Sequence, residues 1–244
     1  KSSDGKTYVY AYKKGTDSVG QECSEDSFYP IENLKLKTFR GNRFVISDFV
    51  IDKSNIKARD GLEATGLFSR IGQAGLGQTS IIIDGVTLQN FDVKGNGCTY
   101  AGALVGLINS GCTDAQINGV LVMKGTNSGD KSIVTGAKNC GGIIGYSNVN
   151  GSGTGDGLKV TNCAVAGTLV GINGSSTADY AGGLIGRLDG RYANIRNSYA
   201  SGMTSGGKYL TNSEDCNVRA TGYAGGLIGY IYSPSEWSEG KYHS

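Results

Sequence analysis

Four short apolar segments, each enclosed by glycines or alanine, recur along the chain at nearly regular intervals. The four copies are Gly102-Ala103-Leu104-Val105-Gly106, Gly141-Gly142-Ile143-Ile144-Gly145, Gly182-Gly183-Leu184-Ile185-Gly186 and Gly225-Gly226-Leu227-Ile228-Gly229. A fifth, degenerate copy is Thr65-Gly66-Leu67-Phe68-Ser69, so the first positions of successive copies are 37, 39, 41 and 43 residues apart. Repeats of this length indicate a stacked architecture, because one unit alone cannot bury its apolar face.

A second element recurs between these segments: an apolar strand with a polar pivot and a glycine five residues later. Its copies are Leu88–Gly95, Val160–Gly167 and Ile195–Gly202, with a looser copy at Ile117–Gly125. Clusters of Gly, Ser, Asn and Asp separate the strands and are typical of turns and loops. Each unit of about 40 residues is therefore expected to hold at least two strands, and no segment has a convincing helical period.

The glycines of the first element indicate close approach of neighbouring backbones. We expect the element itself to be a strand, in which the adjacent Leu184 and Ile185 point to opposite, covered faces. Tyr100, Tyr180 and Tyr223 share the position two residues before the first glycine of their copies, with Asn139 in the remaining copy. Copies stacked about 4.8 Å apart would align these tyrosines in a ladder. We interpret the ladder as stabilising, with a sugar-binding platform as the alternative.

The expected fold class is therefore all-β: a β-solenoid, and specifically a right-handed parallel β-helix built from repeats of about 40 residues. A β-prism or a propeller of the same repeats is the structural alternative. All six phenylalanines lie at or before Phe91, and terminal units of solenoids need a cap. We therefore divide the chain into an amino-terminal cap, residues 1–38, and a repeat solenoid, residues 39–244.

The repeats resemble a known family. The Gly-Gly-Leu-Ile-Gly segments and the strands of the form Ile-x-Asn-x-x-x-x-Gly are similar to the GLUG repeat over residues 39–229, and Phe39-Arg40-Gly41 resembles the segment that leads into such repeats. The resemblance implies a bacterial, secreted or cell-surface module, as in adhesin-like proteins or the amino-terminal regions of IgA-cleaving metallopeptidases. It implies no catalytic residue, because the repeat itself has none.

Composition and charge argue against several other classes. The chain has 41 glycines but only two prolines among 244 residues, unlike collagen or a proline-rich linker. Its net charge of +2 is dispersed, whereas a nucleic-acid-binding surface needs clustered basic residues. No segment approaches the roughly 18 apolar residues of a membrane span. The polar start at Lys1 leaves open a cytoplasmic chain or a chain whose signal has been removed, and the resemblance favours an extracellular or cell-surface location.

Catalytic patterns are scarce. His243 is the only histidine, so a His-Glu-x-x-His metal site is absent and a Ser-His-Asp triad lacks an ordered base. We expect no cofactor and no metal site; calcium is the alternative, although the full spacing of a calcium loop is missing. Many β-helical enzymes cleave polysaccharides with grouped carboxylates. Asp48, Asp52, Asp84 and Asp92 are candidates for such a group, so a polysaccharide lyase or glycoside hydrolase is the alternative to a non-enzyme.

Six cysteines allow 15 complete pairings, and their spacing does not choose among them. They are Cys23, Cys98, Cys112, Cys140, Cys163 and Cys216. Cys140 and Cys163 also fit positions of small core residues. In an oxidising compartment we expect at least one disulfide, and a bond between neighbouring coils such as Cys98 to Cys140 is geometrically the easier kind.

The leading functional hypothesis is a non-catalytic module for adhesion, ligand binding or rigid spacing. Its expected partners are a host protein or glycan, or neighbouring domains or subunits. The alternatives are a polysaccharide-active enzyme, a substrate-recruiting segment of a larger secreted peptidase and a head-to-tail filament subunit. The alternating Tyr8, Tyr10 and Tyr12 mark one candidate interaction strand, which would either pair with another chain or cap its own amino-terminal coil.

Overall fold

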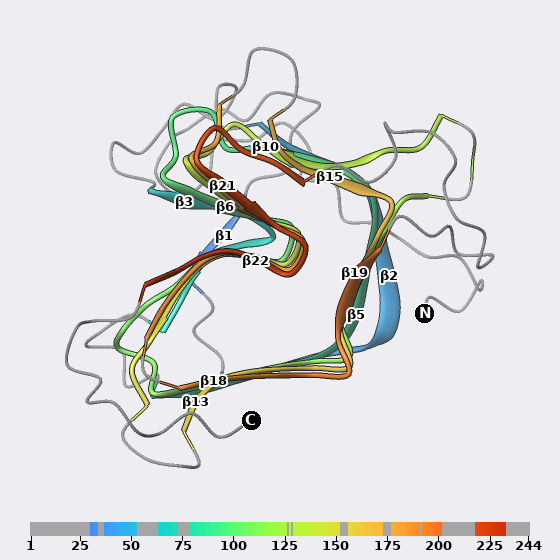
Figure 1. Cartoon of the computed structure of the whole chain (residues 1–244). Coiled ribbons are helices and arrows are strands. Elements are labelled where there is room, and N and C mark those ends of the chain that lie inside the picture. The colour runs from blue at the N-terminus through green and yellow to red at the C-terminus, as the bar shows by residue number, and fades with distance from the viewer. Residues whose placement is uncertain are drawn as a thin grey trace, which may run out of the picture.

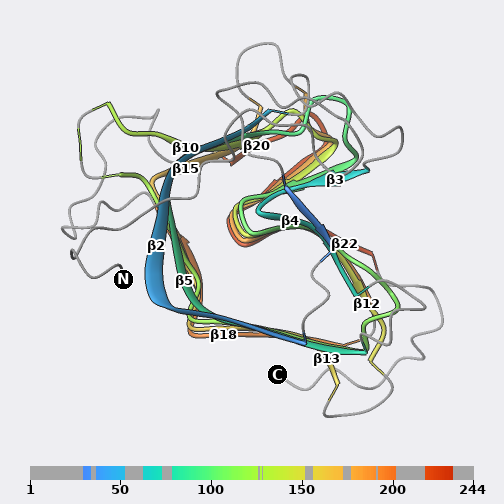
Figure 2. The same cartoon turned by 180° about the vertical axis from the view of Figure 1, so that it is seen from behind.

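The computed structural model is all-β, with 22 strands and no helix in the part of the chain that it describes. The described residues are 30–33, 37–52, 63–72, 79–125, 127, 129–151, 156–172, 177–190, 192–201 and 218–232. Figures 1 and 2 look along the molecule from its two ends, and in both views successive repeats lie one above another. We call each such repeat a coil and number the coils from 1 to 5.

The first three strand groups belong to the amino-terminal half of the stack. A short strand, β1 (Ile31–Asn33), precedes coil 1. Coil 1 consists of β2 (Thr38–Asp52), β3 (Ala64–Thr65) and β4 (Phe68–Ile71). Coil 2 consists of β5 (Ser80–Lys94), β6 (Tyr100–Gly102) and β7 (Val105–Ile108).

The remaining three coils have five strands each, because the long strand of coils 1 and 2 is divided into three. Coil 3 consists of β8 (Asp114–Asn118), β9 (Leu121–Met123), β10 (Ser132–Thr135), β11 (Asn139–Gly141) and β12 (Ile144–Val149). Coil 4 consists of β13 (Gly157–Thr161), β14 (Ala164–Ala166), β15 (Thr168–Gly171), β16 (Tyr180–Gly182) and β17 (Ile185–Gly190). Coil 5 consists of β18 (Ala193–Arg196), β19 (Tyr199–Ser201), β20 (Val218–Arg219), β21 (Tyr223–Gly225) and β22 (Ile228–Tyr232).

Strands at the same place in successive coils pair in parallel and form three sheets. The first sheet runs β1-β4-β7-β12-β17-β22, and the third runs β21-β16-β11-β6-β3. The second sheet joins the remaining strands around β5, which pairs with β2, β8, β9 and β10. Parallel pairing between successive repeats fits a β-helix-like fold and not the propeller alternative, whose blades are antiparallel sheets.

Residues with positive φ mark the corners of the coils. The long strand β5 changes direction at Gly85 and Asn90, whose φ values are 64° and 48°. Coil 4 turns its first corner at Asn162, with φ of 54°, in the column of Gly85. Asn and Gly suit these corners because they tolerate the left-handed region better than other residues.

These corners correct one prediction from the sequence. The segment Leu88–Gly95 was expected to match Val160–Gly167, but Leu88 lies in the column of Val122 and Val165. The segment that matches Val160 in coil 2 begins at Ile83. Asn90 and Asn162 both have positive φ, but Asn162 forms the first corner of coil 4 and Asn90 the second corner of coil 2. Aligning the two asparagines in the sequence therefore placed the wrong segments in one column.

The Gly-Gly-Leu-Ile-Gly element is not the continuous strand that we expected. In coil 3 the chain bends sharply at Gly142 and Ile143, between β11 and β12. Figures 1 and 2 show this bend as a re-entrant fold in every coil: the strand of the third sheet runs inward and the strand of the first sheet runs back out. A Cβ on Gly141 would overlap the carbonyl oxygen of Ile144, so the tight bend requires glycine there.

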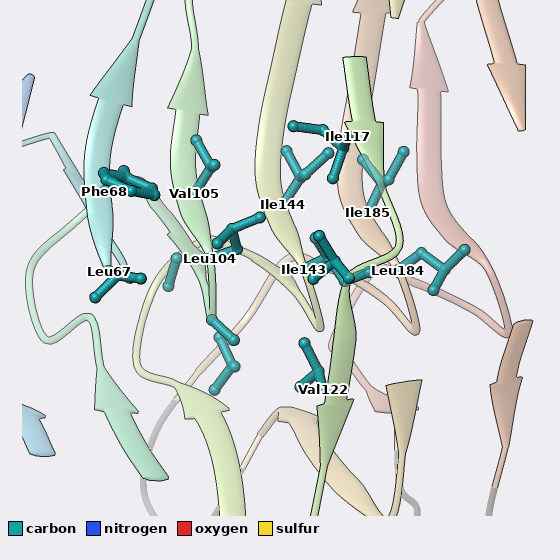
Figure 3. Packing of buried hydrophobic residues seen from close by; sticks show 14 of the residues in the cluster. Leu67, Phe68, Leu104, Val105, Ile117, Val122, Ile143, Ile144, Leu184 and Ile185 are labelled. Carbon is teal, nitrogen blue, oxygen red and sulfur yellow. The ribbon is translucent and has the colours of Figure 1, made fainter. Parts of the chain in front are cut away.

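The bends carry fully buried side chains. One row consists of Leu104, Ile143 and Leu184. The second row consists of the next residue of each coil: Val105, Ile144 and Ile185. All six are fully buried. Figure 3 shows the two rows running from coil to coil, with Ile117 and Val122 among them. Burying one such side chain stabilises the folded state by about 1.5–3 kcal/mol. Both sides of the Leu-Ile pair are thus covered, as the sequence predicted.

No disulfide joins the four described cysteines, so the bond from Cys98 to Cys140, our example of the geometrically easier kind, is not formed. Cys140 pairs in register with Ala101 and Ala181, which confirms its interpretation as a small core residue. Burial raises the pKa of Cys140 to about 12, and its Sγ lies 3.3 Å from the carbonyl oxygen of Ala137. Cys23 and Cys216 lie outside the described residues.

The predicted amino-terminal cap, residues 1–38, is described only at 30–33 and 37–38. Within it, β1 pairs with β4, where Ile31 lies beside Phe68. Pro30 is buried. This pairing joins β1 to the same stack as the repeats.

Candidate functional site

Two columns of side chains at the re-entrant fold form the main candidate site. In the third sheet, Tyr100, Asn139, Tyr180 and Tyr223 pair in register, as the sequence predicted. In the first sheet, the parallel column is Leu107, Tyr146, Arg187 and Tyr230. We name the five tyrosines, Arg187 and Asp189 the tyrosine–arginine cluster.

The rings of the cluster stack across the two sheets. Tyr100 stacks on Tyr146 with 4.5 Å between ring centroids, because Asn139 leaves no ring above Tyr100 in its own column. Tyr180 likewise stacks on Tyr230 at 4.6 Å. Such stacked pairs add about 0.5–1.5 kcal/mol beyond the area that they bury. The predicted tyrosine ladder is therefore present in register, but its rings stack mainly with tyrosines of the other column.

Arg187 links the two stacks. Its guanidinium carbon lies 5.5 Å from the ring centroid of Tyr146 and 5.6 Å from that of Tyr230. Both distances are within the range of a cation–π interaction. The cluster thus runs without interruption from coil 2 to coil 5.

Asp189 fixes the arginine in this position. Its carboxylate accepts hydrogen bonds from Arg187 Nε at 2.9 Å and Nη2 at 2.8 Å. The Tyr146 hydroxyl of the preceding coil donates to the same carboxylate at 3.0 Å. Hydrogen bonding to Asp189 raises the pKa of Arg187, and burial together with the Asp189 charge raises the pKa of Tyr146. At neutral pH the guanidinium is therefore charged and the phenol is neutral.

The cluster offers edges and polar groups more than open ring faces. Tyr100, Tyr146, Tyr180 and Tyr230 are half-buried, and their faces contact one another. Tyr223, in the last coil, has 60% of its surface exposed. A sugar ring that binds by stacking needs a free aromatic face, and Tyr223 is the one tyrosine of the cluster that is exposed and not half-buried.

The four candidate carboxylates do not form one group, but the structure brings two of them together. Lys94 Nζ lies 3.5 Å from Asp52 Oδ2 and 3.2 Å from Asp92 Oδ2. Burial raises the pKa of Asp92, and the Lys94 charge opposes this. The second oxygen of Asp92 is buried and has no hydrogen-bond partner among the described residues.

The other two carboxylates belong to corner contacts between coils. Asp84 accepts a hydrogen bond from Asn118 at 2.7 Å, Asn162 donates to Asn118 at 3.1 Å, and Asn197 donates to Asn162 at 3.3 Å. This ladder braces one corner through four coils. Asp48 accepts hydrogen bonds from Ser47 and, at 2.6 Å, from Asn90, and these bonds lower its pKa.

Several other candidates can be placed only in part. No group of three or more metal-ligating side chains occurs within the described ranges. Tyr8, Tyr10, Tyr12 and His243 lie outside those ranges. The part of the chain that the structure describes includes no helix that could span a bilayer.

Comparison with known proteins adds no relative: no family model, curated protein or solved structure matches the chain. The site must therefore be interpreted from its own residues. Sequence reasoning missed Tyr146, Arg187, Asp189 and Tyr230. A signal was available, because Tyr146, Arg187 and Tyr230 each directly follow the last glycine of a repeated segment.

Proposed function

We propose that the chain is a β-solenoid of the GLUG type, wound as a right-handed parallel β-helix, that acts as a non-catalytic module in the extracellular space or on a bacterial cell surface. One observation carries the proposal: residues of successive repeats pair in unbroken columns, such as Val105, Ile144, Ile185 and Ile228. A stack in which each coil is fixed by the next holds a side surface in a constant geometry. This suits a module that presents a binding surface or that holds neighbouring domains a fixed distance apart.

The tyrosine–arginine cluster is the surface that we propose to bind a partner. Tyrosine and arginine are enriched at the energetically important positions of protein interfaces. Because most ring faces are covered by other rings, the accessible edges, hydroxyls and guanidinium favour a host protein over a stacked glycan. No cofactor enters this proposal.

The experiment compares binding of two variants. The wild-type chain is screened against extracellular host proteins and a glycan array. Tyr223→Ala removes the most exposed ring of the cluster, and Tyr199→Ala removes a ring that is 54% exposed elsewhere in the same coil. We expect Tyr223→Ala to weaken binding at least about tenfold, as for an interface hot spot, and Tyr199→Ala to leave it unchanged. Absence of any ligand would reduce the proposal to a spacer.

A polysaccharide-active enzyme is the second candidate. It is favoured by the approach of Asp52 and Asp92 to one lysine and by the raised pKa of Asp92, which suits a general acid. New reducing ends or unsaturated products from a glycan panel, lost in Asp92→Asn, would support it. The third candidate, a substrate-recruiting segment of a larger secreted peptidase, would be supported if the chain bound a peptidase substrate without cleaving it.

A further inference from the structure

Among the strands that the structure describes, those of coil 5 are the last in all three sheets. The first sheet ends at β22 and the third at β21, while β18, β19 and β20 hold the same place in the second sheet. No described strand pairs with the outer edges of these five strands. The end also exposes large apolar side chains, including Leu227, Ile231 and Tyr232. Such an edge is a template for another strand.

Gly226 gives a second, independent indication that something covers this end. A Cβ on Gly142 would overlap the carbonyl oxygen of Gly183 in the next coil, and a Cβ on Gly183 would overlap that of Gly226. Coil 2 has the small Ala103 at this position. Gly226 is also glycine, yet no described atom lies within 4 Å of the place where its Cβ would be. Because Gly226 has no side chain, the backbone of a further coil could lie over it as closely as coil 5 lies over Gly183.

The opposite end of the stack supplies a matching edge. There, among the described strands, the first sheet ends at β1 and the third at β3, and β2 pairs only with β5. Ile31 of β1 is 41% exposed and Phe44 of β2 is 54% exposed. Because all pairing along the stack is parallel, β1 of one copy laid on β22 of another would continue the same hydrogen-bond pattern.

The side chains also favour pairing of β1 of one copy with β22 of another in the register that the stack already uses. Ile31 belongs to the column of Phe68, Val105, Ile144, Ile185 and Ile228, which is apolar throughout. In the continued register, Ile31 of the second copy would lie on Ile228. The contact would therefore extend an existing apolar column by one residue.

We propose that the end face of coil 5 docks the β1 end of a second copy of this chain, head to tail. The inference rests on the proposed solenoid and extends it to assembly. The two surfaces differ, so the contact is heterologous and gives linear chains of molecules unless a ring closes. A second copy supplies the parallel edge, and Gly226, two residues before Ile228, leaves this part of the end face without a side chain.

The test uses the whole chain of 244 residues in analytical ultracentrifugation over a range of concentrations. Wild type should form a series of oligomers. Gly226→Val fills the open space with a branched side chain and should weaken self-association at least about tenfold. Gly129→Val is the matched control, because Gly129 also has open space around its Cβ position but lies between β9 and β10. It should assemble like wild type.

A mixing experiment tests the polarity of the contact. Ile31→Arg should block the β1 end and Gly226→Val the coil 5 end, so each variant alone should be monomeric at the concentrations at which wild type first forms oligomers. Their mixture should form a dimer of one copy of each and nothing larger, because only one compatible pair of ends is left. Circular dichroism of each variant must match the wild type.

Three results would overturn the proposal: a wild type that is monomeric at every concentration, oligomers of Gly226→Val that form at the same concentrations as those of wild type, and a mixture of the two blocked variants that stays monomeric. A monomer whose coil 5 amides are strongly protected from hydrogen exchange would assign the end face to another segment of the same chain. These failures leave the solenoid intact, since contacts between successive coils are measured separately within the monomer.

Discussion

Gly183 lies directly beneath the carbonyl oxygen of Gly226 in the next coil, and a Cβ on Gly183 would overlap that oxygen. The obstacle is backbone that is tied into the stack, so it cannot yield as a flexible side chain would. We predict that Gly183→Ala destabilises the chain by about 1–3 kcal/mol or more, as overpacking does. Urea denaturation followed by circular dichroism measures the change.

The control for this prediction is Gly129→Ala, at a glycine with no atom within 4 Å of its Cβ position. Its free energy of unfolding should stay within about 1 kcal/mol of wild type. Equal effects of the two substitutions would contradict close contact between the bends of coils 4 and 5.

Arg187 is the second test position, because it joins two aromatic stacks and a carboxylate. Arg187→Lys keeps the charge but loses the forked pair of hydrogen bonds to Asp189 and the planar contact with the rings. We expect a loss of about 1 kcal/mol in the free energy of unfolding. Arg196→Lys, at an exposed arginine whose Nε donates to Asn194, should have a smaller effect. The opposite order would show that the cluster does not stabilise the stack.

The hydrogen bonds of Asp114 make the free energy of unfolding depend on pH. Burial alone would raise the pKa of Asp114, but hydrogen bonds from Lys159 at 2.6 Å and Gln116 at 2.8 Å bring it below the ordinary value of 3.8. The carboxylate therefore stabilises the folded state fully above about pH 3.8, and this stabilisation is lost as the pH falls through the lowered folded-state pKa.

The measurement compares wild type with Asp114→Asn in urea at about pH 6 and at about pH 2.5. The difference between their free energies of unfolding should be larger at the higher pH and shrink at the lower pH. A difference that grew on acidification would contradict the lowered pKa.

Thiol reactivity tests the burial of the cysteines. Burial raises the pKa of Cys140 to about 12 and that of Cys163 to about 11, so both are protonated and covered at neutral pH. We expect neither to react with an alkylating reagent in the native protein at about pH 8, and both to react in urea. Mass spectrometry of peptides identifies each site, and rapid native labelling of Cys140 would place it outside the core.

The sequence predicted the stacking of repeats well, because each apolar segment and its tyrosine must fit the same place in successive coils. The shared register of Tyr100, Asn139, Tyr180 and Tyr223 could be read from their common distance to the glycines. Paired glycines in a short apolar segment, however, suit both a closely packed strand and a sharp bend. The bend is determined by contacts between coils, which local sequence does not contain.

The candidate site was predicted in part for the same reason. Tyr146 and Tyr230 meet the tyrosines of the other sheet only because the chain folds back at the bend. Asp52 and Asp92 come together because β2 lies beside β5, whereas Asp48 and Asp84 fall at separate corners. All four residues are aspartates, so residue type alone could not predict which of them come together.

The most direct test of the stacked architecture is a methyl NOE experiment on the chain with labelled alanine. Ala101, Ala181 and Ala224 share one column, in which Ala181 and Ala224 are neighbours and Cys140 separates Ala101 from Ala181. Neighbouring coils are about 4.8 Å apart. The stack predicts a cross-peak between the methyl groups of Ala181 and Ala224 and none between Ala101 and Ala181. Absence of the first cross-peak in the folded monomer would contradict the β-solenoid.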